Sequence, residues 1–156
     1  MILTLISDTH NKHDQITKDL PGGDILIHAG DLSSVGYAHE VKSFCKWFDS
    51  IDNYAVKIFI AGNHDFLFQD SPSEAKEIIN SFKNFNYLQD ELLLFGKEYD
   101  SMIKIYGSPW QPEFFNWAFN LPRGEAIREK WDLIPNGTDI LITHGPVHGF
   151  VDRVIG

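Results

Sequence analysis

Hydrophobic residues are concentrated in four short runs, and a polar cluster follows each run directly. The runs cover residues 2–6, 25–29, 56–61 and 140–142 and consist largely of Ile, Leu and Val. Apolar runs of this length, rich in branched side chains, are typical of β-strands that are buried on both faces. The pattern therefore predicts four buried strands whose carboxyl ends carry polar side chains.

Helical patterns separate these strands, and turn residues mark several of the boundaries. In the segment 37–51, apolar side chains recur at the spacing of one helix face. Ser71-Pro72 is a typical helix start, with Ser71 at the N-cap and Pro72 in the first turn. The predicted helices cover residues 14–20, 37–51, 72–82 and 123–133.

The segment after residue 86 has a different pattern. Residues 91–95 and 102–106 are short strand-like pieces, which predict a hairpin rather than another helical crossover. Residues 109–119 form an aromatic loop that we interpret as core packing, with the wall of a substrate site as the alternative. Alternating strands and helices with one antiparallel insertion predict an α/β fold, with ligand sites at the carboxyl ends of the strands.

The composition is that of one globular domain spanning residues 1–156. Its 22 Asp and Glu residues outnumber the 13 Lys and Arg residues, which gives a formal net charge of -9. Because affinity for nucleic acid comes largely from Lys and Arg side chains that neutralise phosphates, this charge argues against a nucleic-acid polymer as partner. A small phosphate ester remains compatible with it, since bound divalent cations would invert the local field.

Cys45 is the only cysteine, which excludes an intrachain disulfide and a zinc site built from several thiolates. Its neighbours Phe44 and Trp47 indicate a buried position. The first residues contain no basic leader, and no apolar run reaches the length of a membrane span. We therefore expect a protein of the cytoplasm that has no membrane partner.

The four polar clusters contain side chains that bind divalent cations. They are Asp8-Thr9-His10, Gly30-Asp31, Gly62-Asn63-His64-Asp65 and Thr143-His144-Gly145. Taken singly they are weak signals, because Asp-x-His occurs by chance, Gly-Asp is ordinary turn chemistry, and the tetrapeptide also suits a capped turn. Taken together, carboxylate, amide and imidazole groups at neighbouring strand ends predict a metal site.

In this order, the four clusters resemble the motifs of the calcineurin-like metallophosphoesterases, a superfamily of dimetal phosphatases and phosphodiesterases. Residues 28–32, 107–110 and 143–146, followed by Asp152-Arg153, are most similar to the small branch of metallophosphoesterase-domain proteins that act on phosphodiesters. The resemblance implies an α/β/β/α sandwich of mixed sheets flanked by helices. It also implies hydrolysis of phosphodiesters of a nucleotide-like kind.

The resemblance assigns five metal ligands. Asp8 and His10 would bind a first ion, Asp31 would bridge two ions, and Asn63 and His144 would bind the second. Mn²⁺, Fe or Zn²⁺ are the implied ions. Two cations roughly 3.5–4 Å apart can stabilise the attacking and leaving oxygens of an in-line displacement, and a hydroxide bridging them would be the nucleophile.

Further residues have implied roles beside the two ions. His64 would be the general acid, since imidazole groups titrate near neutral pH. Asp65 would orient His64, or else cap the following turn. Asn63 would also contact a phosphate oxygen, and His148 would face the substrate.

One motif of the family, a Gly-His-x-His that completes both metal shells, is absent from a sequence that ends at Gly156. We expect the chain to be a C-terminally truncated fragment, with exposed apolar surface and an unprotected sheet edge near residues 151–155. The alternatives are a short relative that recruits other ligands, or a degenerate scaffold that binds metal or nucleotide without catalysis. A mononuclear hydrolase that uses Asp8, His10 and Asp31 alone is a third hypothesis.

Three other histidines are predicted outside the metal shells. His28 falls within an apolar run and is expected to be buried. His13 is expected to line the entrance of the site or to be solvated, and His39 to lie on the surface.

Overall fold

Four parallel strands form the first sheet of the computed structural model, which describes residues 1–96 and 102–146. The strands are β1 (Leu3–Ile6), β2 (Gly23–Ala29), β3 (Tyr54–Ile60) and β4 (Asn86–Tyr87), in that spatial order. β2 lies between β1 and β3, with Ile25 opposite Leu3 on β1 and Val56 on β3. The apolar runs therefore predicted three of these strands correctly, whereas the two-residue β4 was missed.

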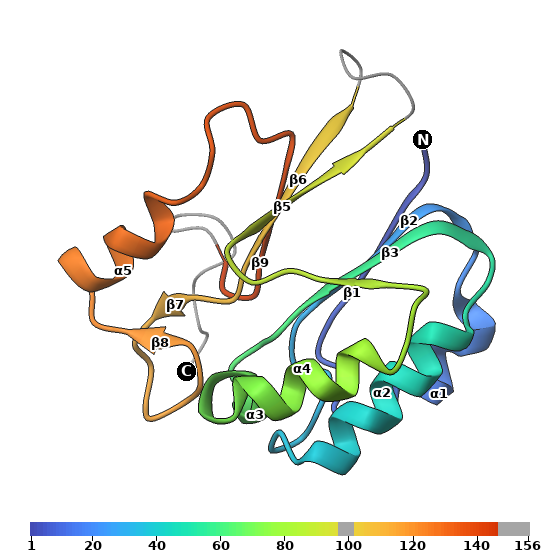
Figure 1. Cartoon of the computed structure of the whole chain (residues 1–156), viewed down its shortest axis with the longest axis horizontal. Coiled ribbons are helices and arrows are strands. Elements are labelled where there is room, and N and C mark those ends of the chain that lie inside the picture. The colour runs from blue at the N-terminus through green and yellow to red at the C-terminus, as the bar shows by residue number, and fades with distance from the viewer. Residues whose placement is uncertain (97–101, 147–156) are drawn as a thin grey trace, which may run out of the picture.

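Helices cover one face of this sheet (Figure 1). They are α1 (His13–Ile16) with a 3₁₀ turn at Thr17–Asp19, α2 (Ala38–Ser50), α3 (Phe66–Asp70) and α4 (Pro72–Asn80). α2 packs its apolar stripe on β2 and β3 through Phe44 and Phe48, which are fully buried. The predicted helix at 14–20 is therefore two short turns, and α3 was not predicted. Ser71 is the N-cap of α4, as expected, but its side chain makes no capping hydrogen bond.

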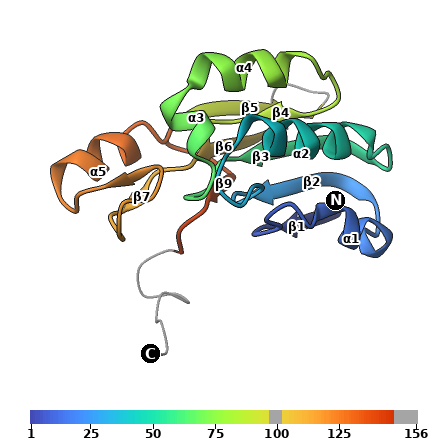
Figure 2. The same ribbon diagram turned by 90° about the horizontal axis from the view of Figure 1, so that it is seen from below.

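A second sheet contains β5 (Glu91–Phe95), β6 (Ile103–Ser108) and β9 (Ile140–Thr143). β5 and β6 are antiparallel, which confirms the predicted hairpin, and β6 is parallel to β9. Ile27, Ile58, Ile105 and Ile142 form a buried core between the two sheets. α5 (Glu125–Trp131) lies beside the second sheet, away from α1 to α4 (Figure 2). The order of layers is the predicted α/β/β/α sandwich.

The aromatic loop 109–119 is divided between core and surface. Phe119 is fully buried and Trp110 packs against the helical core, whereas Phe114 and Phe115 are 64% and 73% exposed. Two short strands, β7 (Gln111–Pro112) and β8 (Asn120–Leu121), pair in parallel around it. The interpretation as core packing is therefore correct for only part of the loop.

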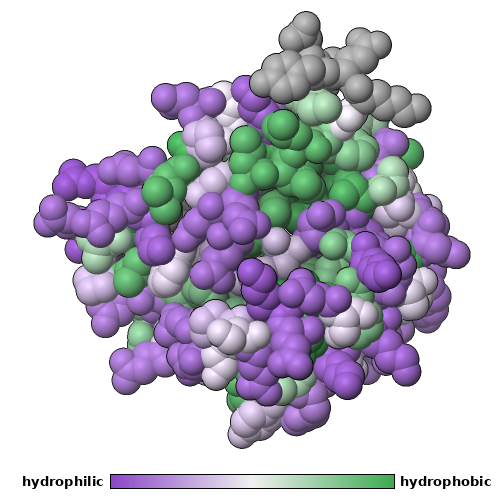
Figure 3. Space-filling view, viewed as in Figure 1, coloured by the Kyte–Doolittle hydropathy of each residue, from purple (hydrophilic) through white to green (hydrophobic). Residues whose placement is uncertain are grey.

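Hydrophobic side chains gather near the β5–β6 hairpin on the face shown in Figure 3. Leu92 and Leu94 of β5 are 41% and 44% exposed. Leu3 and Leu5 on the edge strand β1 are also exposed. The predicted apolar surface at residues 151–155 lies outside the described residues. Among the helices that are described, none is both long and apolar enough to cross a membrane.

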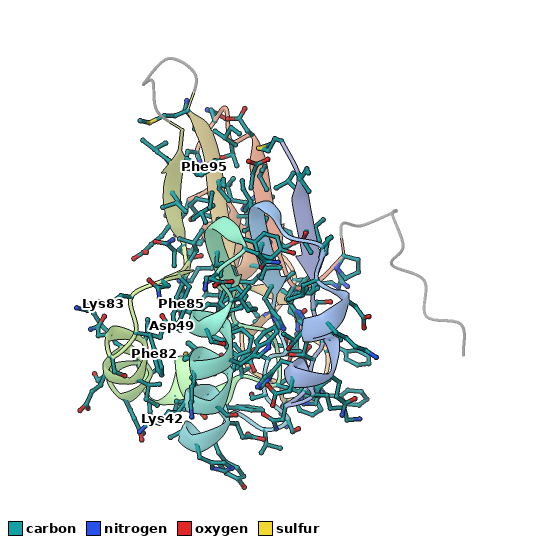
Figure 4. All side chains as sticks on the ribbon, turned by 90° about the vertical axis from the view of Figure 1, so that its right-hand side faces the viewer. Lys42, Asp49, Phe82, Lys83, Phe85 and Phe95 are labelled. Carbon is teal, nitrogen blue, oxygen red and sulfur yellow. The ribbon has the colours of Figure 1, made fainter. Side chains whose placement is uncertain are left out.

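The C-terminal end of α2 is tied to other elements by side-chain hydrogen bonds. Asp49 accepts backbone N–H hydrogen bonds from Lys83 and Asn84, which tie the segment after α4 to α2 (Figure 4). Lys57 on β3 is buried, and its Nζ donates to the carbonyl oxygens of Phe48, Asp49 and Ile51. These carbonyls lie in the last turn of the helix and just beyond it, where no intrahelical donor reaches them.

Replacing Lys57 with methionine is expected to lower the free energy of unfolding by about 1–3 kcal/mol, because buried carbonyl oxygens would lose their donor. Chemical denaturation followed by circular dichroism measures this change. Lys42→Met is the matched control, since Lys42 is an exposed lysine on α2, the helix that Lys57 contacts (Figure 4). Equal denaturation midpoints for the two variants would show that Lys57 does not stabilise the end of α2.

Candidate metal centre

The carboxyl ends of β1, β2, β3 and β9 bring the four predicted clusters together. Asp8 and His10 follow β1, Asp31 follows β2, His64 follows β3, and His144 comes directly after β9. In parallel strands all carboxyl ends lie at one edge of the sheet, where ligand sites are common. The two sheets contribute to the same site, because His144 of the second sheet contacts Asp31 of the first.

Asp31 lies at the centre of this cluster and is buried. Its Oδ1 is 3.3 Å from His144 Nε2 and accepts the backbone N–H of His64 at 2.9 Å. Its Oδ2 is 3.6 Å from His10 Nε2 and 3.9 Å from His64 Nε2. The two carboxylate oxygens therefore face different imidazole groups, which is the arrangement of a carboxylate that serves two cation positions.

All three histidines are oriented by backbone carbonyl oxygens. The Nδ1 atoms contact these oxygens at 2.9 Å in His10 with Ser33, 2.7 Å in His64 with Ser34 and 2.8 Å in His144 with Ala29. Because a carbonyl oxygen can only accept, Nδ1 carries the hydrogen in each ring. The Nε2 atoms are then the ring atoms turned toward the Asp31 carboxylate, and these are the atoms that would bind a metal ion.

The surroundings of His144 test whether a cation fits. Its Nε2 lies 3.0 Å from Asn63 Oδ1 and 3.3 Å from Asp31 Oδ1, so it faces oxygen acceptors while Nδ1 is already occupied. Burial lowers the pKa of His144, but the hydrogen bond and negative charge of Asp31 outweigh burial and raise it to about 9. The position between these groups stabilises positive charge, and its donor set suits a divalent ion.

The described side chains form two groups of ligand atoms that lie within 4.8 Å of one another. One group contains His10, Asp31 and His64, and the other contains Asp8, Asp31 and His144. Asp31 is common to both, as expected of a bridging residue. The structure groups Asp8 with His144 and His64 with His10, and the assignment of ligands to each ion stays a prediction.

Asp65 holds two loops together and does not orient the His64 side chain. Its fully buried carboxylate accepts hydrogen bonds from the backbone N–H of Gly62 at 2.8 Å and Ser33 at 3.0 Å, and from the Ser33 hydroxyl. The partner of His64 Nδ1 is the Ser34 carbonyl oxygen. The predicted role of Asp65 in orienting His64 is therefore wrong, and its side chain makes no cap to α3 either.

The loops of the site have unusual backbone conformations. Asp8, His10, Asn11 and Asp31 have positive φ angles between 40° and 63°, which non-glycine residues seldom adopt. Gly62 approaches Asp31 so closely that a β-carbon there would overlap the carboxylate. Such strain is typical of functional sites, where the surrounding structure holds the chain in place.

The remaining histidines lie outside the metal cluster. His28 is fully buried, as predicted, and its Nε2 lies 2.9 Å from the Thr9 hydroxyl, while burial lowers its pKa to about 3. His39 is exposed, as predicted. His13 is only 1% exposed and packs against Phe44 and Trp47, so the prediction of a solvated or entrance position is wrong. His148 lies outside the described residues.

Two residues of the aromatic loop contact the metal cluster, although neither belongs to the four polar motifs of the sequence. The Trp117 ring lies 4.2 Å from the His64 ring, centroid to centroid. Gln111 Nε2 donates to Asn63 Oδ1 at 3.3 Å. The only signal in the sequence was the aromatic loop, for which a substrate wall was the alternative interpretation.

Comparison with known proteins agrees with this geometry. A family model described as Calcineurin-like phosphoesterase matches residues 1–155, nearly the whole chain. The chain belongs to the calcineurin-like phosphoesterase family. The family consists of metal-dependent hydrolases of phosphoric esters, so the clustered carboxylate and imidazole groups of this calcineurin-like phosphoesterase are candidate metal ligands.

Relatives of known name align with almost the whole chain. Human "Metallophosphoesterase domain-containing protein 1" is 45% identical over 170 residues, which cover 96% of this chain and 49% of the human protein. "UPF0046 protein T07D4.2" of Caenorhabditis elegans is 40% identical over 176 residues, covering 96% of this chain and 42% of that protein. The chain thus spans about half the length of the curated relatives it matches.

A solved structure has the same fold at low sequence identity. The protein TT1561 of Thermus thermophilus superposes with a TM-score of 0.64 at 14% identity, covering 96% of this chain and 70% of that chain. This calcineurin-like phosphoesterase therefore shares its architecture with a distant bacterial protein.

Proposed function

We propose that the chain carries the catalytic centre of a phosphodiesterase that acts on small, nucleotide-like esters with two divalent ions, Mn²⁺, Fe or Zn²⁺. The observation that carries the proposal is the position of Asp31, whose two oxygens face His144 on one side and His10 and His64 on the other. Bound divalent ions would supply Lewis acidity and an activated water.

The residues of the chain would hold charge and substrate in place. Asp31 places a negative charge between the two cation positions and so reduces their mutual repulsion. The Asn63 side chain lies at the His144 side, where its NH₂ group can donate to a phosphate oxygen, and Gln111 holds it there by donating to its Oδ1. The buried Cys45 takes no part, because burial and the nearby Asp49 raise the pKa of its thiol to about 12.

His64 is placed to protonate the leaving oxygen. Its ring is fixed by the Ser34 carbonyl at Nδ1, by the face of Trp117 and by the edge of His10, whose centroid is 4.7 Å away. Nε2 is thereby turned to the same side as the Asp31 carboxylate. A proton on Nε2 could pass to the departing alkoxide without movement of the ring, as general acid catalysis requires.

Replacing His64 with glutamine is expected to lower kcat by about 10²–10⁴-fold while metal content stays unchanged. Hydrolysis of bis(4-nitrophenyl) phosphate by protein supplied with Mn²⁺ measures the rate, and elemental analysis measures the metal. His39→Gln is the matched control, since His39 is exposed and belongs to neither group of ligand atoms. If His64→Gln also loses metal, His64 is a metal ligand and not the general acid. If wild-type protein hydrolyses the ester no faster than His64→Gln, the proposed catalytic activity is contradicted.

A further inference from the structure

Glu40 lies in the first turn of α2, outside the metal cluster, yet the residue is only 7% exposed and its carboxylate is surrounded by hydrogen-bond donors. One of these is the backbone N–H of Tyr37, which donates to Oε2 at 2.9 Å. This bond belongs to the capping box that begins α2. A capping box needs no more from the glutamate, so the remaining donors have another explanation.

Three further donors come from two separate loops. The backbone N–H groups of Ser34 and Val35 each lie 3.3 Å from a Glu40 oxygen. The side-chain amide of Asn11 donates to Oε1 at 2.5 Å and also lies 2.9 Å from the Ser34 hydroxyl. Hydrogen bonds to an ionised carboxylate are stronger than neutral ones, so Glu40 ties the loop after β1 to the loop after β2.

These two loops hold the groups that orient two of the three histidines. Asn11 directly follows His10, and the loop after β2 supplies the carbonyl oxygens of Ser33 and Ser34. Glu40 therefore restrains both partners of the bond between His10 and Ser33, and the acceptor of the bond from His64. His144 differs, because its acceptor is the carbonyl of Ala29 at the end of β2, which Glu40 does not contact.

We propose that Glu40 is a positioning residue that fixes the orientation and tautomer of His10 and His64 through the carbonyl groups of Ser33 and Ser34. Partners in the outer shell of a metal site typically change metal affinity or activity by 10–100-fold when they are replaced. The inference rests on the proposed metal centre for its functional meaning. Its structural content concerns the histidine rings and can be measured without any metal.

The test is Glu40→Gln, in which one acceptor oxygen becomes an amide that cannot accept from Asn11 and the loop at once. Long-range ¹H–¹⁵N spectra of metal-free protein report which nitrogen of each imidazole carries the hydrogen. We expect the His10 and His64 signals to move from the Nδ1–H form toward a mixture, while the His144 signals stay unchanged. Affinity for Mn²⁺, measured by calorimetry, is expected to fall by about 10–100-fold.

Glu74→Gln is the matched control, because Glu74 occupies the same position in the first turn of α4 and is exposed. It should leave all three histidines and the Mn²⁺ affinity unchanged. Folded Glu40→Gln protein with wild-type signals for His10 and His64 would overturn the proposal. Equal disturbance of His144 would also overturn it, since that result indicates general loosening.

Asn11→Gly provides a second variant if Glu40→Gln does not fold. Glycine tolerates the φ of 63° at this position and removes only the side chain. The variant should disturb the His10 signals and leave His144 unchanged, and undisturbed His10 signals would count against the proposal. The spectra do not depend on whether the protein hydrolyses phosphodiesters. The proposed role of Glu40 and the proposed function can therefore be disproved separately.

Discussion

Asp31→Asn is expected to abolish hydrolysis and to weaken binding of both ions. The substitution removes the negative charge that faces His144 through Oδ1 and His10 through Oδ2. It also places an amide NH₂, which cannot bind a cation, on one of the two sides. Because this residue is itself a proposed ligand, affinity should fall by more than the 10–100-fold typical of an outer-shell partner.

Calorimetric titration with Mn²⁺ measures both binding steps of Asp31→Asn. Asp14→Asn is a suitable control, because Asp14 is an exposed carboxylate on α1 that belongs to neither group of ligand atoms. A variant that retains one binding step at wild-type affinity would show that Asp31 serves a single ion. Retention of both steps would remove Asp31 from the metal centre.

Asp65→Asn is expected to have the largest effect on stability. The carboxylate is fully buried and accepts from the backbone N–H groups of Leu32, Ser33 and Gly62 and from the Ser33 hydroxyl. An asparagine of the same shape would turn an NH₂ group toward some of these donors and leave them unsatisfied. Since each such group costs about 1–3 kcal/mol, we expect a loss of at least about 3 kcal/mol in the free energy of unfolding.

Urea denaturation compares Asp65→Asn with Asp70→Asn, an exposed control at the end of the neighbouring helix α3. The control is expected to change stability by less than about 0.5 kcal/mol. Because Asp65 links the loop of Asp31 to the loop of His64, its loss should also weaken Mn²⁺ binding in whatever fraction remains folded. Equal midpoints for the two variants would contradict the structural role of Asp65.

The sequence predicted the framework well where burial alone determines structure. Both faces of β2 and β3 are covered, by the helices on one side and the second sheet on the other. An apolar run in the sequence was therefore sufficient to predict these strands. The sequence failed where elements are short, as in α3 (Phe66–Asp70) and β4 (Asn86–Tyr87). The two residues of β4 and the short helix α3 are too short to show a period, and their positions depend on tertiary contacts.

The candidate site was predicted in composition but only partly in geometry. Asp8, His10, Asp31, Asn63, His64 and His144 stand at strand ends, which topology brings together, and the structure places them in one cluster. The sequence could not show that Ser33, Ser34 and Ala29 orient the histidines, because every residue has a carbonyl group. The sequence also could not show that Asp65 accepts from backbone N–H groups, since an aspartate in a turn can equally accept from a neighbouring histidine or cap the following turn.

The proposed metal centre depends on Asp31 serving two cation positions at once. A crystal grown with Mn²⁺ and measured near the manganese absorption edge tests it most directly, because anomalous scattering locates each ion. We expect two peaks roughly 3.5–4 Å apart, both within bonding distance of Asp31, with one next to His10 and the other next to His144. A single peak, or two peaks that do not share Asp31, would contradict it.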